Sequence, residues 1–310
     1  MSVNPIWLAD IVKRALDEDI GYGDITTEAI VSPGTQAKAV IKAKEDGRLA
    51  GLEVAATVFR LLDETIRFQP ETADGRDVAA GEVLVNLTGP AAPLLLGERV
   101  ALNFLQRLSG IATMTAKAVK EAAPYGARIV DTRKTTPTLR ALEKYAVRMG
   151  GGYNHRFGLD DAVLIKENHI AVAGGIKEAV ALVRRRVGHM VKVEVEVEHL
   201  HQIDEALEAG VDAILLDNMD PETMKKAVQM VHSRFGREGA PGAPEASGAP
   251  GAPGAAVAAG TGGRPLLEAS GDVSISTVAA VAATGVDIIS MGKLTRSAPS
   301  LDLSMRLYML

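Results

Sequence analysis

Residues 191–218, VKVEVEVEHLHQIDEALEAGVDAILLDN, decide the fold, because two short apolar runs here enclose a helical segment. Short runs that alternate with helices of this size are typical of βα units, which build a parallel sheet through right-handed crossovers. The pattern recurs in ARIVD, AVLIK, PLLEAS and VDIISMG, at residues 127–131, 162–166, 265–270 and 286–292. These six runs favour a closed or partly closed barrel, and a doubly wound sheet stays open as an alternative.

The residues before this pattern predict a separate unit of mixed helices and strands. Asn4-Pro5 supplies a cap residue and a proline at the first helical position, so we expect a helix that ends near Gly21. The segments AKAVIKAKEDG (37–47) and DGRDVAAGEVLVNLTGP (74–90) combine alternation with turn residues, which predicts strands. A helical pattern follows from Pro93 to Arg107, and we place the domain boundary near Ser109-Gly110.

A tract of Gly, Ala and Pro occupies residues 237–263 and lacks the large apolar residues that a core needs. We therefore expect a disordered surface insertion there. The letters EASG occur inside the tract, at Glu245 to Gly248, and again at Glu268 to Gly271. Only the second copy follows a strand-like run and precedes a helix-like run, so we expect only that copy at a strand-to-helix turn.

Composition restricts the class of protein. The 310 residues are 47% hydrophobic and 24% charged, which is typical of a globular enzyme with one large or two smaller domains. The absence of cysteine excludes disulfides, thiolate nucleophiles and cysteine-bound metals, and agrees with a reducing cytoplasm. A net charge of −5 argues against nucleic-acid binding. We expect neither a signal peptide nor a membrane span, and hence a cytoplasmic enzyme.

Charged or glycine-rich residues follow each expected strand. Because the carboxyl ends of barrel strands converge on one face, where active sites are built, we expect these residues to share one cavity. They are Asp131 to Lys134, Lys166 to His169, Glu196 and Glu198, Asp217 and Asn218, Ser270 and Gly271, and Gly292, Lys293 and Thr295.

A basic cluster within this set predicts an anion site. Arg133 and Lys134 follow a strand, and His155 and Arg156 lie in the next loop. Guanidinium groups bind planar carboxylates through two parallel hydrogen bonds, so a ligand with carboxylates is favoured. Three more basic residues have helical spacing and are expected on a solvated helix face instead: Arg140, Lys144 and Arg148.

Acidic residues predict a second part of the site. Glu196 and Asp217 end neighbouring strands and suit either Mg2+, which takes carboxylates together with substrate oxygens, or the hydroxyls of a ribose. For Glu194, on the same strand face as Glu196, a structural ion pair and a functional role are equally expected. A zinc site is not expected, because cysteine is absent and the histidines are scattered.

Two glycine-bearing loops predict a phosphate site. EASGD (268–272) precedes a helix-like run, and SMGKLT (290–295) follows the last strand. Such loops direct backbone N–H groups at phosphates, and the last two strands of a barrel are the usual position for them. Ordinary glycine turns are the competing interpretation of both loops.

The quoted motifs resemble the quinolinate phosphoribosyltransferase family. The resemblance covers nearly the whole chain except the tract at 237–263, and it rests on strings in the family's order and spacing. These are GERVALNFLQRLSGIAT, DTRKTTPTLRALEKYAVRMGGGYNHRFGL, LIKENHI, VEVEVE, LLDNM, EASGD and SMGKLT. It implies an α/β fold in which an (incomplete) α/β barrel, residues 110–296, is joined to an N-terminal open α/β sandwich domain, residues 1–109, to which residues 297–310 return.

The resemblance also implies roles for individual residues. Lys134, Lys166, Glu196 and Asp217 are implied in catalysis, the last two also as Mg2+ ligands. The dicarboxylate is implied to contact Thr132, Arg133, Lys134, His155, Arg156 and Lys166, together with Arg99 from a partner subunit. The 5-phosphate is implied to contact Ser270, Gly271, Asp272, Met291, Gly292 and Lys293. Asp272 stands where many relatives have a second glycine.

The implied reaction joins quinolinate to phosphoribosyl pyrophosphate (PRPP) with Mg2+, and releases pyrophosphate and CO2. The ring nitrogen is itself the nucleophile, so no serine or cysteine nucleophile is needed. A homodimer with a shared active site is implied, and a higher oligomer stays open. The alternatives are a related phosphoribosyltransferase for another base, and a non-catalytic barrel that binds phosphorylated metabolites.

Overall fold

A computed structural model describes residues 3–235 and 263–310. The chain forms two compact units. The first consists of Met1–Ala116, Thr136–Gly151 and Ser297–Leu310, and the second of Lys117–Thr135 and Gly152–Arg296. The expected insertion at 237–263 lies, except for Gly263, outside the described residues, and so does the first EASG copy.

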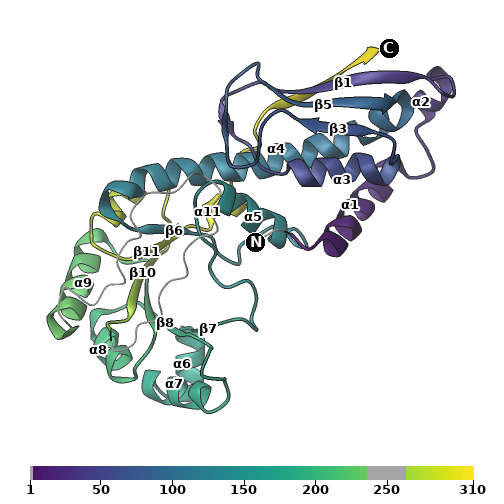
Figure 1. Cartoon of the computed structure of the whole chain (residues 1–310). Helices are drawn as coiled ribbons and strands as arrows, with labels where there is room; N and C mark the ends of the chain where they lie inside the picture. The colour runs from purple at the N-terminus through teal and green to yellow at the C-terminus, as the bar shows by residue number, and fades with distance from the viewer. Residues whose placement is uncertain (1–2, 236–262) are drawn as a thin grey trace. The chain divides into compact units, whose positions relative to one another are not determined.

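The first unit is built on a four-stranded antiparallel sheet in the order β12-β1-β5-β3. Figure 1 shows α3 and α4 along one face of this sheet. The helices are α1 (Pro5–Ile20), α2 (Ile25–Ile30), α3 (Leu52–Leu62), α4 (Ala91–Ala122) and α5 (Arg140–Met149). The strands are β1 (Gln36–Ala43), β2 (Gly47–Arg48), β3 (Arg67–Pro70), β4 (Asp77–Val78), β5 (Val83–Pro90) and β12 (Leu303–Met309).

Local sequence signals explain the first elements. The Asn4 side chain caps α1 by accepting from the Ile6 N–H at 2.9 Å, and the helix ends before Gly21, whose φ is 56°. In β1 exposed and buried residues alternate, so Ala37, Ala39 and Ile41 face the core. The predictions of a capped helix and a half-exposed strand are confirmed.

The second unit contains six parallel strands in the order β6-β11-β10-β9-β8-β7. In Figure 1, α8 and α9 cover the outer side of the strands. The strands are β6 (Arg128–Val130), β7 (Val163–Ile165), β8 (Val193–Val197), β9 (Ala213–Asp217), β10 (Leu266–Ser270) and β11 (Ile288–Ser290). The helical segments are η1 (Ala123–Tyr125), α6 (Glu167–Ala173), α7 (Ile176–Arg184), α8 (Leu200–Glu208), α9 (Pro221–Phe235), α10 (Val278–Ala282) and α11 (Lys293–Arg296).

This strand order identifies an incomplete α/β barrel. From β7 to β11 each strand pairs with the next one along the chain, and the last strand, β11, pairs with the first, β6. A doubly wound sheet would instead reverse its order at a switch point. Within the described residues β6 and β7 do not pair with each other, and a parallel bridge from Val130 to Tyr153 lies beside β6. The barrel prediction is confirmed.

Strand register puts the polar residues on the inner face. Glu196 of β8 pairs with Leu215 of β9, which pairs with Glu268 of β10, and Asp217 pairs with Ser270. Because successive residues of a strand point to opposite faces, these side chains share a face that the fully buried valines of β8 do not occupy. The barrel interior therefore carries several carboxylates toward its carboxyl end.

The structure differs from the sequence-based prediction at two places, the expected domain boundary and the expected solvated helix face. The boundary expected at Ser109-Gly110 lies inside α4, which continues to Ala122. The solvated face expected for the helix around Lys144 is wrong at that residue, because only 2% of Lys144 is exposed. Neighbouring Glu143 is also fully buried in α5, where it accepts hydrogen bonds from Arg107 at 2.9 Å and from the Thr136 hydroxyl at 2.7 Å. Helical spacing gave no sign that this part of α5 packs into the first unit.

Candidate active site

A cavity of about 590 Å3 is formed by residues of the second unit. Most of the residues that the sequence singled out lie around it. The predicted residues that line it are Thr132, Arg133, Lys134, His155, Arg156, Lys166, Glu196, Asp217, Ser270, Gly271 and Asp272. Strand-end convergence therefore brings basic, acidic and glycine-bearing segments to one place.

The cationic wall begins directly after β6. The Thr132 hydroxyl accepts from the Lys134 N–H at 3.0 Å, and the Thr295 hydroxyl donates to the Lys134 carbonyl at 2.8 Å. A Cβ on Gly292 would lie 2.9 Å from Cδ of Lys134, so the small residue leaves room for this side chain. The turn is thus held from two sides while Arg133 and Lys134 line the cavity.

A buried carboxylate holds the second basic segment. Asp131 is fully buried and accepts from the His155 N–H at 2.9 Å and from Nδ2 of Asn154 at 2.5 Å. Next to it, Nη1 of Arg156 donates to the Ala162 carbonyl at 3.1 Å. Burial lowers the pKa of Arg156, and the positive charge of Arg133 lowers it further, although arginine stays charged at neutral pH. Two guanidinium groups therefore lie close enough to repel one another, while the negative charges of Glu194 and Asp161 act on Arg156 in the opposite direction.

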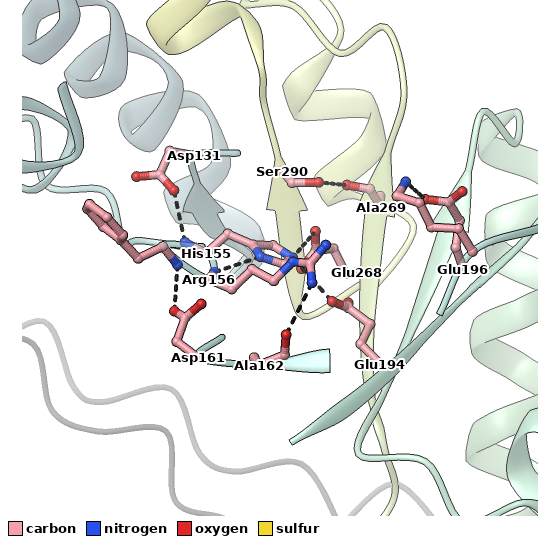
Figure 2. Close-up of polar contacts among 12 residues, drawn as sticks. Asp131, His155, Arg156, Asp161, Ala162, Glu194, Glu196, Glu268, Ala269 and Ser290 are labelled. Atoms are coloured by element: carbon pink, nitrogen blue, oxygen red, sulfur yellow. Dashed lines mark hydrogen bonds and ion pairs between the residues drawn. The ribbon is translucent and has the colours of Figure 1, made fainter. Parts of the chain in front are cut away.

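His155 lies between two buried carboxylates, as Figure 2 shows. Its Nε2 is 3.2 Å from Oε2 of Glu194 and 3.5 Å from Oε1 of Glu268. Its Nδ1 accepts the Arg156 N–H at 2.7 Å, so the ring proton belongs on Nε2. These three ligand atoms lie within 4.8 Å of one another, a spacing that by itself would also admit a metal ion.

Glu268 has the largest perturbation in this group. Burial raises its pKa to about 8, and the negative charge of Glu194 raises it in the same direction. Only 3% of the residue is exposed, and its Oε1 has no hydrogen-bond partner. A carboxyl group in this environment favours its protonated form.

The acidic strand ends form the opposite wall. Glu196 is paired with the ammonium group of Lys166, the residue that follows β7. Asp217, at the end of β9, accepts from Nδ2 of Asn218 at 2.8 Å. Both carboxylates are only partly exposed and line the cavity, so they can meet a hydroxyl-rich ligand or a cation there.

The EASGD loop needs its glycine. Gly271 has a φ of 135°, and a Cβ there would lie 2.6 Å from Oδ1 of Asn218. The Asn218 N–H donates to the Ser270 carbonyl at 3.0 Å, which ties the ends of β9 and β10 together. Asp272 pairs with Lys293 at 2.6 Å, and this hydrogen bond and charge lower the pKa of Asp272.

Some predicted residues lie elsewhere. Met291 is fully buried, and its N–H donates to the Val130 carbonyl at 3.0 Å, so that group is already used in the sheet. Gly292 lies beside the Lys134 side chain, and Lys293 pairs with Asp272. Neither Gly292 nor Lys293 lines the cavity itself. Arg99 is an exposed residue of α4 in the first unit.

Sequence reasoning missed Glu268 and Arg296, which both line the cavity. Arg296 ends α11 and carried no motif signal. Glu268 did carry one, because it is the single charged residue in the strand PLLEAS and has the same strand parity as Ser270. An isolated carboxylate inside a buried strand indicates a functional or paired group.

An α/β barrel with a polar cavity at its strand ends is typical of an enzyme that acts on small molecules. Comparison with known proteins makes this specific. Residues 24–109 match the N-terminal domain model, and residues 111–250 and 253–306 the C-terminal domain model, of quinolinate phosphoribosyl transferase. The chain belongs to the quinolinate phosphoribosyltransferase family.

Individual relatives are similar over their whole length. A probable nicotinate-nucleotide pyrophosphorylase (carboxylating) of Bacillus subtilis is 43% identical over 98% of this chain and 94% of its own. The protein of the same name from Synechocystis is 41% identical over 99% and 95%. The solved structure of NadC from Streptococcus pyogenes has a TM-score of 0.87 and 40% identity, and the match covers 100% of this chain and 99% of that one.

Proposed function

We propose that this chain transfers the phosphoribosyl group of PRPP to the ring nitrogen of quinolinate, with release of pyrophosphate and CO2. The product is nicotinate mononucleotide, which serves NAD biosynthesis. One observation carries the proposal: cations, carboxylates and a glycine loop from separate strand ends line a single cavity. The family membership and the names of the relatives support the same reaction.

The cationic wall suits the two carboxylates of quinolinate. Arg133 and Arg156 supply planar guanidinium groups, and Lys134 and Lys166 supply point charges. His155 lines the cavity beside them, with its ring orientation fixed by the Arg156 N–H. Binding a dianion would relieve the repulsion between the two arginines, so the pocket favours a dicarboxylate over a monocarboxylate.

The acidic wall suits the sugar. Bond breaking at the anomeric carbon develops positive charge on the ribose, and preorganised negative groups stabilise such charge. We assign this role to Glu196 and Asp217. Lys134 and Lys166 face the departing negative charge and the carboxylates, so these four residues form the catalytic set.

A divalent cation fits the same carboxylates. Glu196 and Asp217 end adjacent strands, offer only oxygen atoms and are partly buried on one cavity wall. Mg2+ prefers such donors and retains positions for substrate oxygens. We propose that Mg2+ binds there with PRPP, where it would neutralise charge on the pyrophosphate.

The EASGD loop and the start of α11 are assigned to the 5-phosphate. Ser270, Gly271 and Asp272 line the cavity, and Gly292 and Lys293 lie beside them. Met291 contributes packing to this assignment, since its N–H is bonded within the sheet. The glycines allow backbone N–H groups to approach a phosphate.

The assembly and the location belong to the same proposal. Arg99 is exposed on α4, where a second copy of the chain could bring it to a cavity, so we propose a homodimer with shared active sites. The part of the chain that the structure describes contains no helix with the length and apolarity of a bilayer span. We propose that the enzyme works in the cytoplasm.

A single assay tests the function. Purified protein is incubated with PRPP, Mg2+ and either quinolinate or nicotinate, and pyrophosphate, CO2 and mononucleotide are measured. The expected result is stoichiometric release of pyrophosphate and CO2 in the reaction with quinolinate, and none in the reaction with nicotinate. Turnover of nicotinate in its place would identify a related phosphoribosyltransferase, and PRPP binding without pyrophosphate release would identify a binding protein.

A further inference from the structure

A buried carboxyl group to which the proposed reaction has so far assigned no role lines the cavity. Glu268 lines the cavity from β10 although only 3% of it is exposed. Its Oε1 lies 3.5 Å from Nε2 of His155 and forms no hydrogen bond. An unpartnered buried oxygen is costly in a structural role, which suggests that its partner is supplied by a substrate.

The surroundings of Glu268 determine which group holds the proton. Glu194 from β8 and Asp131 after β6 face it with negative charge, and both raise its pKa. His155 and a hydrogen bond from the Ser290 side chain act in the opposite direction and lower the pKa of Glu268. Burial, together with these two carboxylates, outweighs the lowering and favours the protonated form of Glu268.

We propose that Glu268 is the general acid that protonates C2 of the pyridine ring when the 2-carboxylate leaves as CO2. This inference rests on the proposed function and adds the proton donor that it lacks. The bond between C2 and the carboxyl carbon breaks, and its electron pair stays on C2, stabilised by the N-ribosylated ring. While this bond breaks, the O–H bond of Glu268 also breaks and its proton joins C2, and solvent later reprotonates the carboxylate.

Other cavity residues are less suited to this step. Lys166 is paired with Glu196, and an ammonium group is a weak acid at neutral pH. Lys134 is placed on the cationic wall, where losing its proton would weaken carboxylate binding. The His155 proton lies toward Glu194 and Glu268, so that ring is a positioning residue for the acid.

The test separates bond formation from decarboxylation in single turnovers. Pyrophosphate release and CO2 release from carboxyl-labelled quinolinate are timed in the wild type, Glu268→Gln and Glu268→Asp. Glu205→Gln, an exposed carboxylate of α8, is the matched control. In Glu268→Gln we expect CO2 release to slow roughly 100-fold relative to pyrophosphate release, the range of a lost general acid. Glu268→Asp should restore part of the rate, because it returns an acidic proton.

The outcomes distinguish the two proposals. A wild type that releases no pyrophosphate would contradict the proposed function itself. An active wild type with an unchanged CO2 rate in Glu268→Gln would overturn only the role of Glu268. If this variant does not fold, the pH dependence of CO2 release in the wild type is the test. The rate of CO2 release should fall as pH rises from about 6 to about 9, because a buried acid loses its proton over this range. A CO2 step that does not change over this range would overturn the role of Glu268.

Discussion

The carboxylate of Asp272 lies 2.6 Å from the ammonium group of Lys293. The positive charge beside the proposed phosphate loop is therefore already paired with an acidic side chain. The Asp272 side chain is 85% exposed and lines the cavity, whereas that of Lys293 is 26% exposed. Asp272 therefore competes with an incoming phosphate for the same positive charge.

The first prediction concerns this competition. Asp272→Asn should lower the KM for PRPP, because Lys293 would become available to the phosphate. The expected change is roughly two- to fivefold, as for an exposed ion pair. Steady-state kinetics at low salt provide the measurement. In a Lys293→Ala background the same substitution should have no effect, and an equal effect in both backgrounds would show that Asp272 does not act through Lys293.

The second prediction concerns the cationic wall. Arg156→Ala should lower kcat/KM for quinolinate roughly 10- to 100-fold, the range for a lost hydrogen bond to a charged group, while the fold stays intact. Lys134→Ala should act in the same direction. Arg185→Ala, an exposed residue at the end of α7, removes the same charge away from the cavity and should have no effect. Wild-type kinetics for both Arg156→Ala and Lys134→Ala would refute the pocket assignment.

The third prediction follows from the raised pKa of Glu268. The unfolded carboxyl group titrates near its ordinary value of 4.5, and the folded one near 8, so the folded state binds more protons between these values. The contribution of this group to stability is complete below about pH 4.5 and is lost as pH rises toward about 8. The Tm of the wild type should therefore fall over this range by on the order of a few degrees more than that of Glu268→Gln. Parallel pH profiles of the two proteins would contradict the assigned protonation.

The fourth prediction concerns Gly271. Gly271→Ala should destabilise the protein by about 1–3 kcal/mol and raise the KM for PRPP, because the new Cβ meets Asn218 and the backbone φ is unfavourable. Gly188→Ala is the matched control, since a Cβ there contacts nothing within 4 Å. Denaturant unfolding measures both changes. Equal stability of the two variants would mean that the β10 turn tolerates a side chain.

The sequence by itself determined the strands, their order in the chain and the polar residues at their ends. These features are local: alternation along VKVEVEVE fixes which residues share a face, and a charged residue after an apolar run marks where a strand ends. The same signals predicted both ends of α1 and the start of β1 to within a residue, because caps and period-two burial depend on near neighbours. Barrel topology then brought those strand ends together.

Only the tertiary structure decided which groups meet and how strongly they interact. Glu194 and Glu268 belong to strands separated by β9, and their shared contact with His155 depends on register and strand order. Burial, which raises the pKa of Glu268 and encloses Lys144, is a property of all surrounding segments at once. Spacing along the chain cannot report it, because desolvation depends on distances in space.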